Sequence, residues 1–352
     1  SLSGHLILST KGLAKNQSKL TDLMQATIEE PRFDELSRIQ ELIAQTQARQ
    51  ESSITGVGHR LAMTAASRGA TPGAKLAHQW GGLESIRHIK QLDASLKNSQ
   101  NLLGLGEQLT ELHRLILTAP RKYLLIGETD KLDYKGLESN PCFAELKKLG
   151  FEAFSPTHTT CRVSEFWKLN TQVNFCAKSY STVSVAHPDA AALQVLGEFL
   201  RNGYLHRTIR EQGGAYGGGA TQDNTTATFK FFSYRDPRLA ATLDDFDLSL
   251  DWLQNEKHER IQVEESILGV ISSIDKPSSP AGEIKHAFHA ELYGRNREVL
   301  ELFRNQVREA TLEDLQRVAD KYLKKESASI AVIGSNENSG VADTLNLSLM
   351  TL

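Results

Sequence analysis

Residues 204–220 read Tyr-Leu-His-Arg-Thr-Ile-Arg-Glu-Gln-Gly-Gly-Ala-Tyr-Gly-Gly-Gly-Ala. Five glycines fall between Gly213 and Gly219, they surround the single aromatic residue Tyr216, and Arg210 precedes that tyrosine by six positions. Glycine loses more backbone entropy on folding than any other residue, so a run of glycines is kept where the backbone needs unusual dihedral angles or a close approach. A phenol and a guanidinium on such a segment predict a site that grips a peptide or an oxyanion.

This glycine-rich stretch does not match a nucleotide-binding loop. A Walker A loop requires a lysine directly after its last glycine, and none follows here. A dinucleotide-binding fingerprint lies between a strand and a helix, whereas this sequence predicts the order helix, glycines, strand, with the strand over residues 227–234. A flexible loop or a helix stop is the alternative, although five glycines exceed what a helix stop requires.

Length and composition indicate a globular protein of two domains. The chain has 352 residues, of which 39% are hydrophobic and 24% charged, and its net charge is −3. A chain of this length can bury two cores, and its charge gives no general attraction to nucleic acid or to an anionic membrane. No apolar run approaches the roughly 20 residues of a membrane span. We therefore expect neither nucleic acid nor a membrane among the partners.

A weak internal repeat organises the chain. Strand-like segments over 5–10 and 227–234 are each followed by a helix, and each half closes on a strand that ends in Ile-Gly, over 121–127 and 329–334. The second half has a long segment before its first matching strand, and the first half lacks it. We therefore expect the first copy to be truncated and the chain to be part of a longer protein; a genuinely short first domain is the alternative.

The repeat predicts three segments. Residues 1–128 form a truncated α/β domain, residues 129–165 form a polar connector with a short helix near 143–150, and residues 166–352 form a second α/β domain that carries the glycine-rich stretch.

Metal-binding and nucleophile motifs are missing from the sequence. Neither His-Glu-x-x-His nor the inverted His-x-x-Glu-His occurs, no Gly-x-Ser-x-Gly elbow occurs, and the cysteines at 142, 161 and 176 lack a Cys-x-x-Cys spacing. His286 and His289 are three positions apart, which is a spacing that shares a helix face, but such a pair on a polar helix is usually a surface feature. We therefore expect no metal ligands in this chain.

A longer motif around the glycines carries a family resemblance. The run 199–220, the run 231–237 and the segment 291–294 resemble the C-terminal half of presequence proteases, a branch of the pitrilysin (insulinase) superfamily of zinc metallopeptidases. The match is specific over the second half of the chain and looser over the first. It implies an α+β fold of two related pitrilysin-type domains, each an antiparallel-rich sheet with helices packed on one face, the first copy N-terminally truncated.

The resemblance also implies site residues. Enzymes of this family enclose short unstructured peptides in a chamber, and Arg210 and Tyr216 match the arginine and tyrosine that the C-terminal half presents near the scissile bond. Their spacing of six residues matches the presequence-protease branch. Arg210 and Tyr216 are therefore the expected catalytic residues. The expected substrate-binding residues are His206, Gly213, Gly214, Ala215, Gly217 and Gly218.

The absent zinc motif sets the expected partners. By the resemblance, zinc is bound by a missing N-terminal half, so this chain is expected to be inactive alone and to act with that half on short unfolded peptides. The alternatives are a non-catalytic superfamily relative that serves as a structural or peptide-binding subunit, and an unrelated peptide-binding module. Three cysteines without a Cys-x-x-Cys spacing make structural disulfides unlikely and favour a reducing compartment. We expect a bacterial cytoplasm, with the mitochondrial matrix and the periplasm as alternatives.

Overall fold

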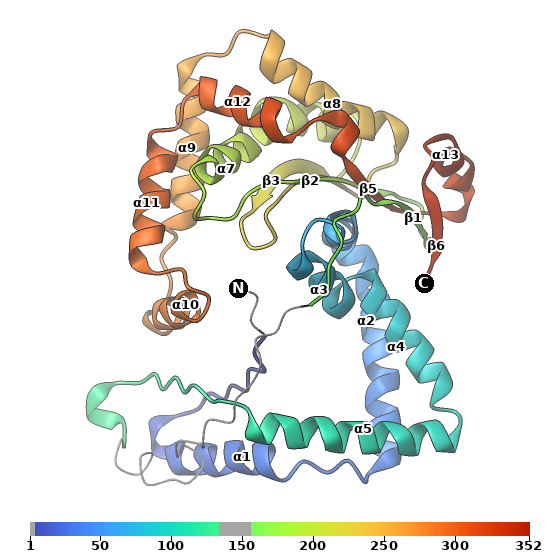
Figure 1. The fold of residues 1–352 in the computed structure, drawn as a ribbon, viewed down its shortest axis with the longest axis vertical. Coiled ribbons are helices and arrows are strands. Elements are labelled where there is room, and N and C mark those ends of the chain that lie inside the picture. Colours follow the sequence, from blue (N-terminus) through green and yellow to red (C-terminus); the bar gives the residue numbers. More distant parts are fainter. Residues whose placement is uncertain (1–3, 134–155) are drawn as a thin grey trace. The chain divides into compact units, whose positions relative to one another are not determined.

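The computed structural model describes residues 4–133 and 156–352 (Figure 1). The helix expected near 143–150 and the cysteine at 142 lie outside the described residues, and Cys161 and Cys176 are both unpaired. By its contacts the chain divides into two compact units. The first combines residues 1–46, 91–155 and 277–295, and the second combines residues 47–90, 156–276 and 296–352.

The first unit is helical in its described residues. It contains α1 (Gln17–Glu29), the first part of α2 (Leu36–Ser67), α5 (Ser99–Thr118) and α10 (Pro280–Leu292). No helix in residues 4–133 or 156–352 is both long enough and apolar enough to cross a membrane.

The two strands expected in this unit are not formed. Residues 5–10 and 121–127 are neither helix nor strand, and they expose apolar side chains, with Leu6 76% and Leu125 43% accessible. A strand needs a hydrogen-bonded neighbour and an apolar surface to cover, and no described residue of the first unit forms a strand. The two segments are apolar as the sequence indicates, but they form no strand within the described residues.

The second unit is built on one six-stranded sheet. Its strands are β1 (Ser164–Lys168), β2 (Phe175–Ser181), β3 (Gly217–Asp223), β4 (Thr228–Tyr234), β5 (Ser329–Gly334) and β6 (Ser348–Thr351). They lie in the order β3-β4-β2-β5-β1-β6. The run from β3 to β5 is antiparallel, whereas β1 is parallel to both β5 and β6. The strands expected over 227–234 and 329–334 and the α+β fold are confirmed.

One face of the sheet is covered by five helices. They are α7 (Asp189–Leu200), α8 (Ala240–Asn255), α9 (Arg260–Ile274), α11 (Arg297–Arg308) and α12 (Leu312–Tyr322). Their apolar stripes meet the inward side chains of β2 and β4, and Phe199, Phe229, Phe231 and Phe246 are all buried in this core. Burying each such side chain contributes about 1.5–3 kcal/mol. Thr311 starts α12 with a reciprocal capping box.

The opposite face is covered by the second part of α2 and by α4 (Leu83–Ser95). Ile54, Leu61 and Leu83 pack there against Trp167 and Phe175 of the sheet. The structure differs here from the expectation of helices on one face alone, because strand β2 is buried on both of its faces and therefore needs two covers. Residues 47–90 therefore share a unit with the sheet, across the boundary expected at residue 128.

The remaining helices are short. Helix α3 (Pro72–Gly81) begins at Thr71, whose side chain accepts a hydrogen bond from the Ala74 backbone, and α13 (Ser339–Thr344) lies between β5 and β6. Short 3-10 turns cover Ala14–Asn16, Thr129–Lys131, Lys325–Ser327 and Asn336–Asn338.

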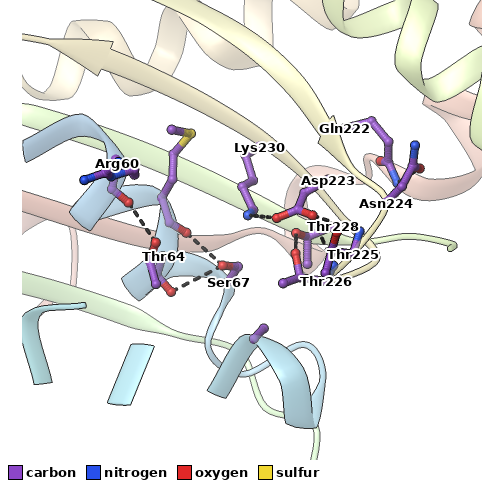
Figure 2. Close-up of polar contacts among 12 residues, drawn as sticks. Arg60, Thr64, Ser67, Gln222, Asp223, Asn224, Thr225, Thr226, Thr228 and Lys230 are labelled. Carbon is purple, nitrogen blue, oxygen red and sulfur yellow. Dashed lines mark hydrogen bonds and ion pairs between the residues drawn. The ribbon is translucent and has the colours of Figure 1, made fainter. Parts of the chain in front are cut away.

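The β3–β4 hairpin is fixed by the carboxylate of Asp223 (Figure 2). It accepts hydrogen bonds from the backbone of Thr225 and Thr226 at 2.9 and 3.1 Å and from Lys230 Nζ at 2.7 Å. An aspartate that bonds the backbone two residues ahead stabilises a tight turn. Thr71 Oγ1 donates to the Thr226 carbonyl at 3.2 Å, which ties this turn to the start of α3. The strand that follows the glycines is thereby anchored at its far end.

Candidate functional site

The helix that carries Arg210 is a π-helix. It spans Arg201–Gln212, is termed η4 here, and continues directly from α7. Helices of this type are rare and occur frequently at functional sites. Leu205 and Ile209 face the core and are fully buried, and Gly203 lies so close to Trp252 that a Cβ atom would collide with its ring. The inner face of η4 is thus fixed by packing, which holds the outer face in a defined orientation.

His206, Arg210 and Glu211 form a polar array on that outer face. Arg210 Nη1 lies 3.3 Å from His206 Nε2, and His206 Nδ1 lies 3.4 Å from Glu211 Oε1. Arginine can only donate, so Nε2 of the imidazole accepts and Nδ1 carries the proton toward Glu211. In an α-helix, residues five apart are separated by about 140° around the axis. The wider turn of the π-helix brings His206 and Glu211 onto one face.

Arg210 is exposed, and among the described residues it has no carboxylate within ion-pair distance. Its only described side-chain hydrogen bond uses one of five N–H donors. The remaining donors face solvent and are available to a carbonyl or carboxylate of a ligand.

Two glycines of the motif are required by the fold. Gly214 has φ +78°, in the region that side chains rarely adopt, and its N–H donates to the Arg210 carbonyl at 3.1 Å. A Cβ atom on Gly213 would collide with the Arg238 guanidinium, which pairs with Asp245 at 3.0 Å. These two residues end η4 and reverse the chain.

The other small residues of the motif differ from one another in their surroundings. Ala215 is buried, and a Cβ atom on Gly218 would meet Ile209 at 2.7 Å, so both positions also have a packing reason. Around Gly217, in contrast, a Cβ atom would find no described atom within 4 Å. Of the expected substrate-binding glycines, Gly217 is the one that neither packing nor a positive φ explains.

Tyr216 directly precedes β3, with 68% of its surface accessible. Its backbone N–H donates to the Tyr234 carbonyl at 3.0 Å, and its ring meets the Tyr234 ring edge-to-face, with centroids 5.4 Å apart at 90°. A large aromatic side chain that stays this exposed on a well-fixed backbone is available to a ligand. The structure therefore places Arg210 at the end of a helix and Tyr216 directly before the next strand, joined by the turn 213–215.

Two supporting residues were not identified from the sequence. Tyr234 lies within the run 231–237 but was not singled out, and His59 of α2 contacts the Tyr234 ring with centroids 4.7 Å apart. Arg235, with φ +51°, lies over the same ring at 5.3 Å. The register of β3 against β4, which the sequence does not specify, brings Tyr234 to Tyr216, and the packing of α2 brings His59 to Tyr234.

The described residues do not fit a metal site. No group of three or more histidine, cysteine or carboxylate side chains in residues 4–133 and 156–352 is arranged to hold a metal ion. His286 and His289 lie on α10, where the His289 ring stacks on Tyr293 with centroids 6.5 Å apart.

Comparisons with known proteins match both parts of the chain. The family model for the region associated with M16 peptidases of subfamily C matches residues 1–92, and the one described as "PreP C-terminal domain" matches residues 164–336. The mitochondrial presequence protease of Yarrowia lipolytica is 30% identical over 345 residues, which cover 94% of this chain and 34% of that protein. Its counterpart in Xenopus laevis is 26% identical over 370 residues, which cover 96% and 35%. The chain spans about a third of the length of these relatives.

Solved structures show the same fold. An inactive peptidase M16 domain from Pseudomonas fluorescens matches 92% of this chain and 76% of its own with a TM-score of 0.52 at 15% identity. Pitrilysin matches 91% of this chain and 33% of its own with a TM-score of 0.52 at 9% identity.

The expected compartment was wrong. We expected a bacterial cytoplasm, but the relatives from Yarrowia lipolytica, Xenopus laevis and Danio rerio are all mitochondrial proteins. Unpaired cysteines indicate reducing conditions, and these do not distinguish a bacterial cytoplasm from a mitochondrial matrix.

Proposed function

We propose a function on the premise that this chain belongs to the M16 peptidase family and corresponds to the C-terminal part of its presequence proteases. In this proposal the chain completes a zinc endopeptidase that acts on short unstructured peptides. The resemblance inferred from residues 199–220 is confirmed by the two family models. The chain's own task is to line part of the peptide chamber and to present Arg210 and Tyr216 to the peptide.

The exposure of Arg210 and Tyr216 at the two ends of one anchored turn carries this proposal. The turn is fixed by Gly213 and Gly214, so the two side chains extend from a backbone that does not have to reorganise when a peptide binds. The Tyr216 hydroxyl can donate to the oxyanion that develops at the scissile carbonyl, and the Arg210 guanidinium can hold a neighbouring carbonyl.

The zinc ion belongs to another part of the enzyme in this proposal. The described residues hold no suitable ligand group, so we assign the metal to an N-terminal half, which is the proposed partner of this chain. Zinc there supplies Lewis-acid polarisation and an activated water. What this chain adds is orientation of the peptide, hydrogen-bond donation and a wall that limits access of bulk water.

Substitution of Tyr216 tests the proposal in the full-length protein that contains this chain. In Tyr216→Phe we expect kcat for an unstructured fluorogenic peptide to fall about 100-fold to 1000-fold, since one oxyanion donor is worth about 2.7–4 kcal/mol. KM should change by less than about threefold, because the hydroxyl acts mainly in the transition state.

Tyr293→Phe is the matched control, since it removes the hydroxyl of another exposed tyrosine and should leave kcat unchanged. If Tyr216→Phe also left kcat unchanged, the oxyanion role would be lost, and a non-catalytic, peptide-binding relative would be the better interpretation.

A further inference from the structure

Helix α2 reaches the sheet beside the candidate site through a local kink. Val57 has non-helical angles (φ −127°, ψ 17°) and lies between Gly56 and Gly58. Gly58 packs directly on the Phe175 ring, where a Cβ atom would come within 2.6 Å, so this turn of the helix approaches the sheet as closely as a backbone can. The next residue, His59, is thereby placed over strand β4.

Strand β4 presents two aromatic rings to His59. The His59 ring lies 5.6 Å from the Phe232 ring and 4.7 Å from the Tyr234 ring, centroid to centroid. Phe232 and Tyr234 are two positions apart and therefore point to the same face of the sheet. Of these two rings, it is the Tyr234 ring that contacts Tyr216.

Tyr234 is held on several sides. His59 and Phe175 flank its ring, the latter with centroids 5.9 Å apart, and the Arg235 guanidinium lies 5.3 Å from the ring centroid. Tyr216 meets the same ring at 90° and also donates its backbone N–H to the Tyr234 carbonyl. A single residue thus fixes both the backbone and the ring of an otherwise exposed tyrosine.

We propose that Tyr234, backed by His59 of α2, is a positioning residue that sets the orientation of the Tyr216 side chain. The inference rests on the proposed function of Tyr216. A free tyrosine samples several rotamers, and a donor that must reach an oxyanion works best when it is already oriented. The Tyr234 ring restricts Tyr216 from one side and leaves 68% of the Tyr216 surface accessible.

The first test replaces the supporting ring in the full-length protein. Tyr234→Leu should lower kcat about tenfold with little change in KM, because the edge-to-face contact with Tyr216 is lost. Tyr234→Phe keeps the ring and should retain kcat. Phe232→Leu is the matched control, since it removes a ring from the same face of the same strand and leaves the Tyr216 contact intact.

A double-mutant comparison separates the inference from the function on which it rests. In a Tyr216→Phe background, Tyr234→Leu should cause no further loss of kcat, because the hydroxyl that it orients is already gone. If Tyr216→Phe alone has no effect, the proposed function fails. If Tyr216→Phe lowers kcat and Tyr234→Leu behaves like Phe232→Leu, the positioning role fails while the function stands.

A third measurement needs no activity. With ring-¹³C-labelled tyrosine, the Tyr216 resonance of this chain should move toward its unstructured position in Tyr234→Leu and stay in place in Phe232→Leu. His59→Leu, which keeps both tyrosines, should move it in the same direction by a smaller amount. An unmoved Tyr216 resonance in both Tyr234→Leu and His59→Leu overturns the inference, whatever the kinetics show.

Discussion

At the scale of single residues, the structure separates glycines that look alike in the sequence. Gly213 faces the Arg238 guanidinium, whereas Gly217 faces open space. We expect Gly213→Ala to destabilise the fold by about 1–3 kcal/mol through overpacking, and Gly217→Ala to leave the midpoint of urea unfolding nearly unchanged. If Gly217 lines the proposed peptide site, Gly217→Ala should nevertheless weaken peptide binding to the full-length protein, because its methyl group enters the open space beside the backbone. Equal stability losses in the two variants would contradict this assignment.

A buried histidine gives the second prediction at this scale. His78 is almost fully buried, neither ring nitrogen has a hydrogen-bond partner among the described residues, and burial lowers its pKa to about 4. Glu84, 3.8 Å away, acts in the opposite direction but is outweighed. Between about pH 6.5 and 4, His78 is therefore protonated in the unfolded chain but neutral in the folded chain. The free energy of unfolding falls as the pH falls through this range.

The difference can be measured by urea unfolding at two pH values. Between about pH 7.5 and about pH 5, the wild-type protein should lose about 2 kcal/mol more stability than His78→Leu. Equal losses in the two proteins would show that His78 is protonated in the folded state.

At the scale of elements, the close approach of α2 to the sheet gives the third prediction. Ala62, Ala65 and Ala66 are fully buried where α2 packs on β2 and β5. Ala65→Leu should therefore destabilise the protein by about 1–3 kcal/mol, because the added atoms force the helix from the sheet. Thr55→Leu, on an exposed position of the same helix, should change stability by less than about 0.5 kcal/mol. Thermal unfolding of the two variants tests this prediction, and equal midpoints for Ala65→Leu and Thr55→Leu would contradict it.

The elements also show how far the sequence could predict the fold. Apolar runs rich in aromatic and β-branched residues correctly located the strands over 227–234 and 329–334. Such runs are typical of strands that are buried in a sheet. The same reasoning placed strands over 5–10 and 121–127, where the structure has none, because the pattern does not say whether a pairing partner exists. The second cover of the sheet by α2 was missed, since apolar spacing identifies a helix face but not the surface that it meets.

The candidate site divides in a similar way. Arg210 and Tyr216 could be named from residue type and spacing, and their exposure on one anchored turn agrees with the role proposed for them. The contribution of Tyr234 and His59 depends on strand register and on a helix kink about 175 positions away in the chain. Neither can be predicted from local pattern.

At the scale of the whole molecule, the fourth prediction concerns metal content. The described residues bring together no ligand group, so the purified chain should carry far less than one zinc per molecule by elemental analysis. A chelator should leave the thermal unfolding midpoint of the chain unchanged. A metal ion bound only to the folded state would stabilise it, and its removal by the chelator would lower that midpoint. Tightly bound stoichiometric zinc would contradict the assignment of the metal to another part of the enzyme.

The two segments 5–10 and 121–127 have a consequence for handling the chain. They display Leu6, Ile7, Leu8, Leu124 and Leu125 to solvent on backbone that belongs to no strand of the described residues. Backbone outside any strand, with exposed leucine and isoleucine side chains, can form strand pairs with a second copy of the chain. We therefore expect the isolated chain to aggregate as its concentration or the temperature rises. These few leucines and isoleucines, and not the stability of the sheet, should set the limit.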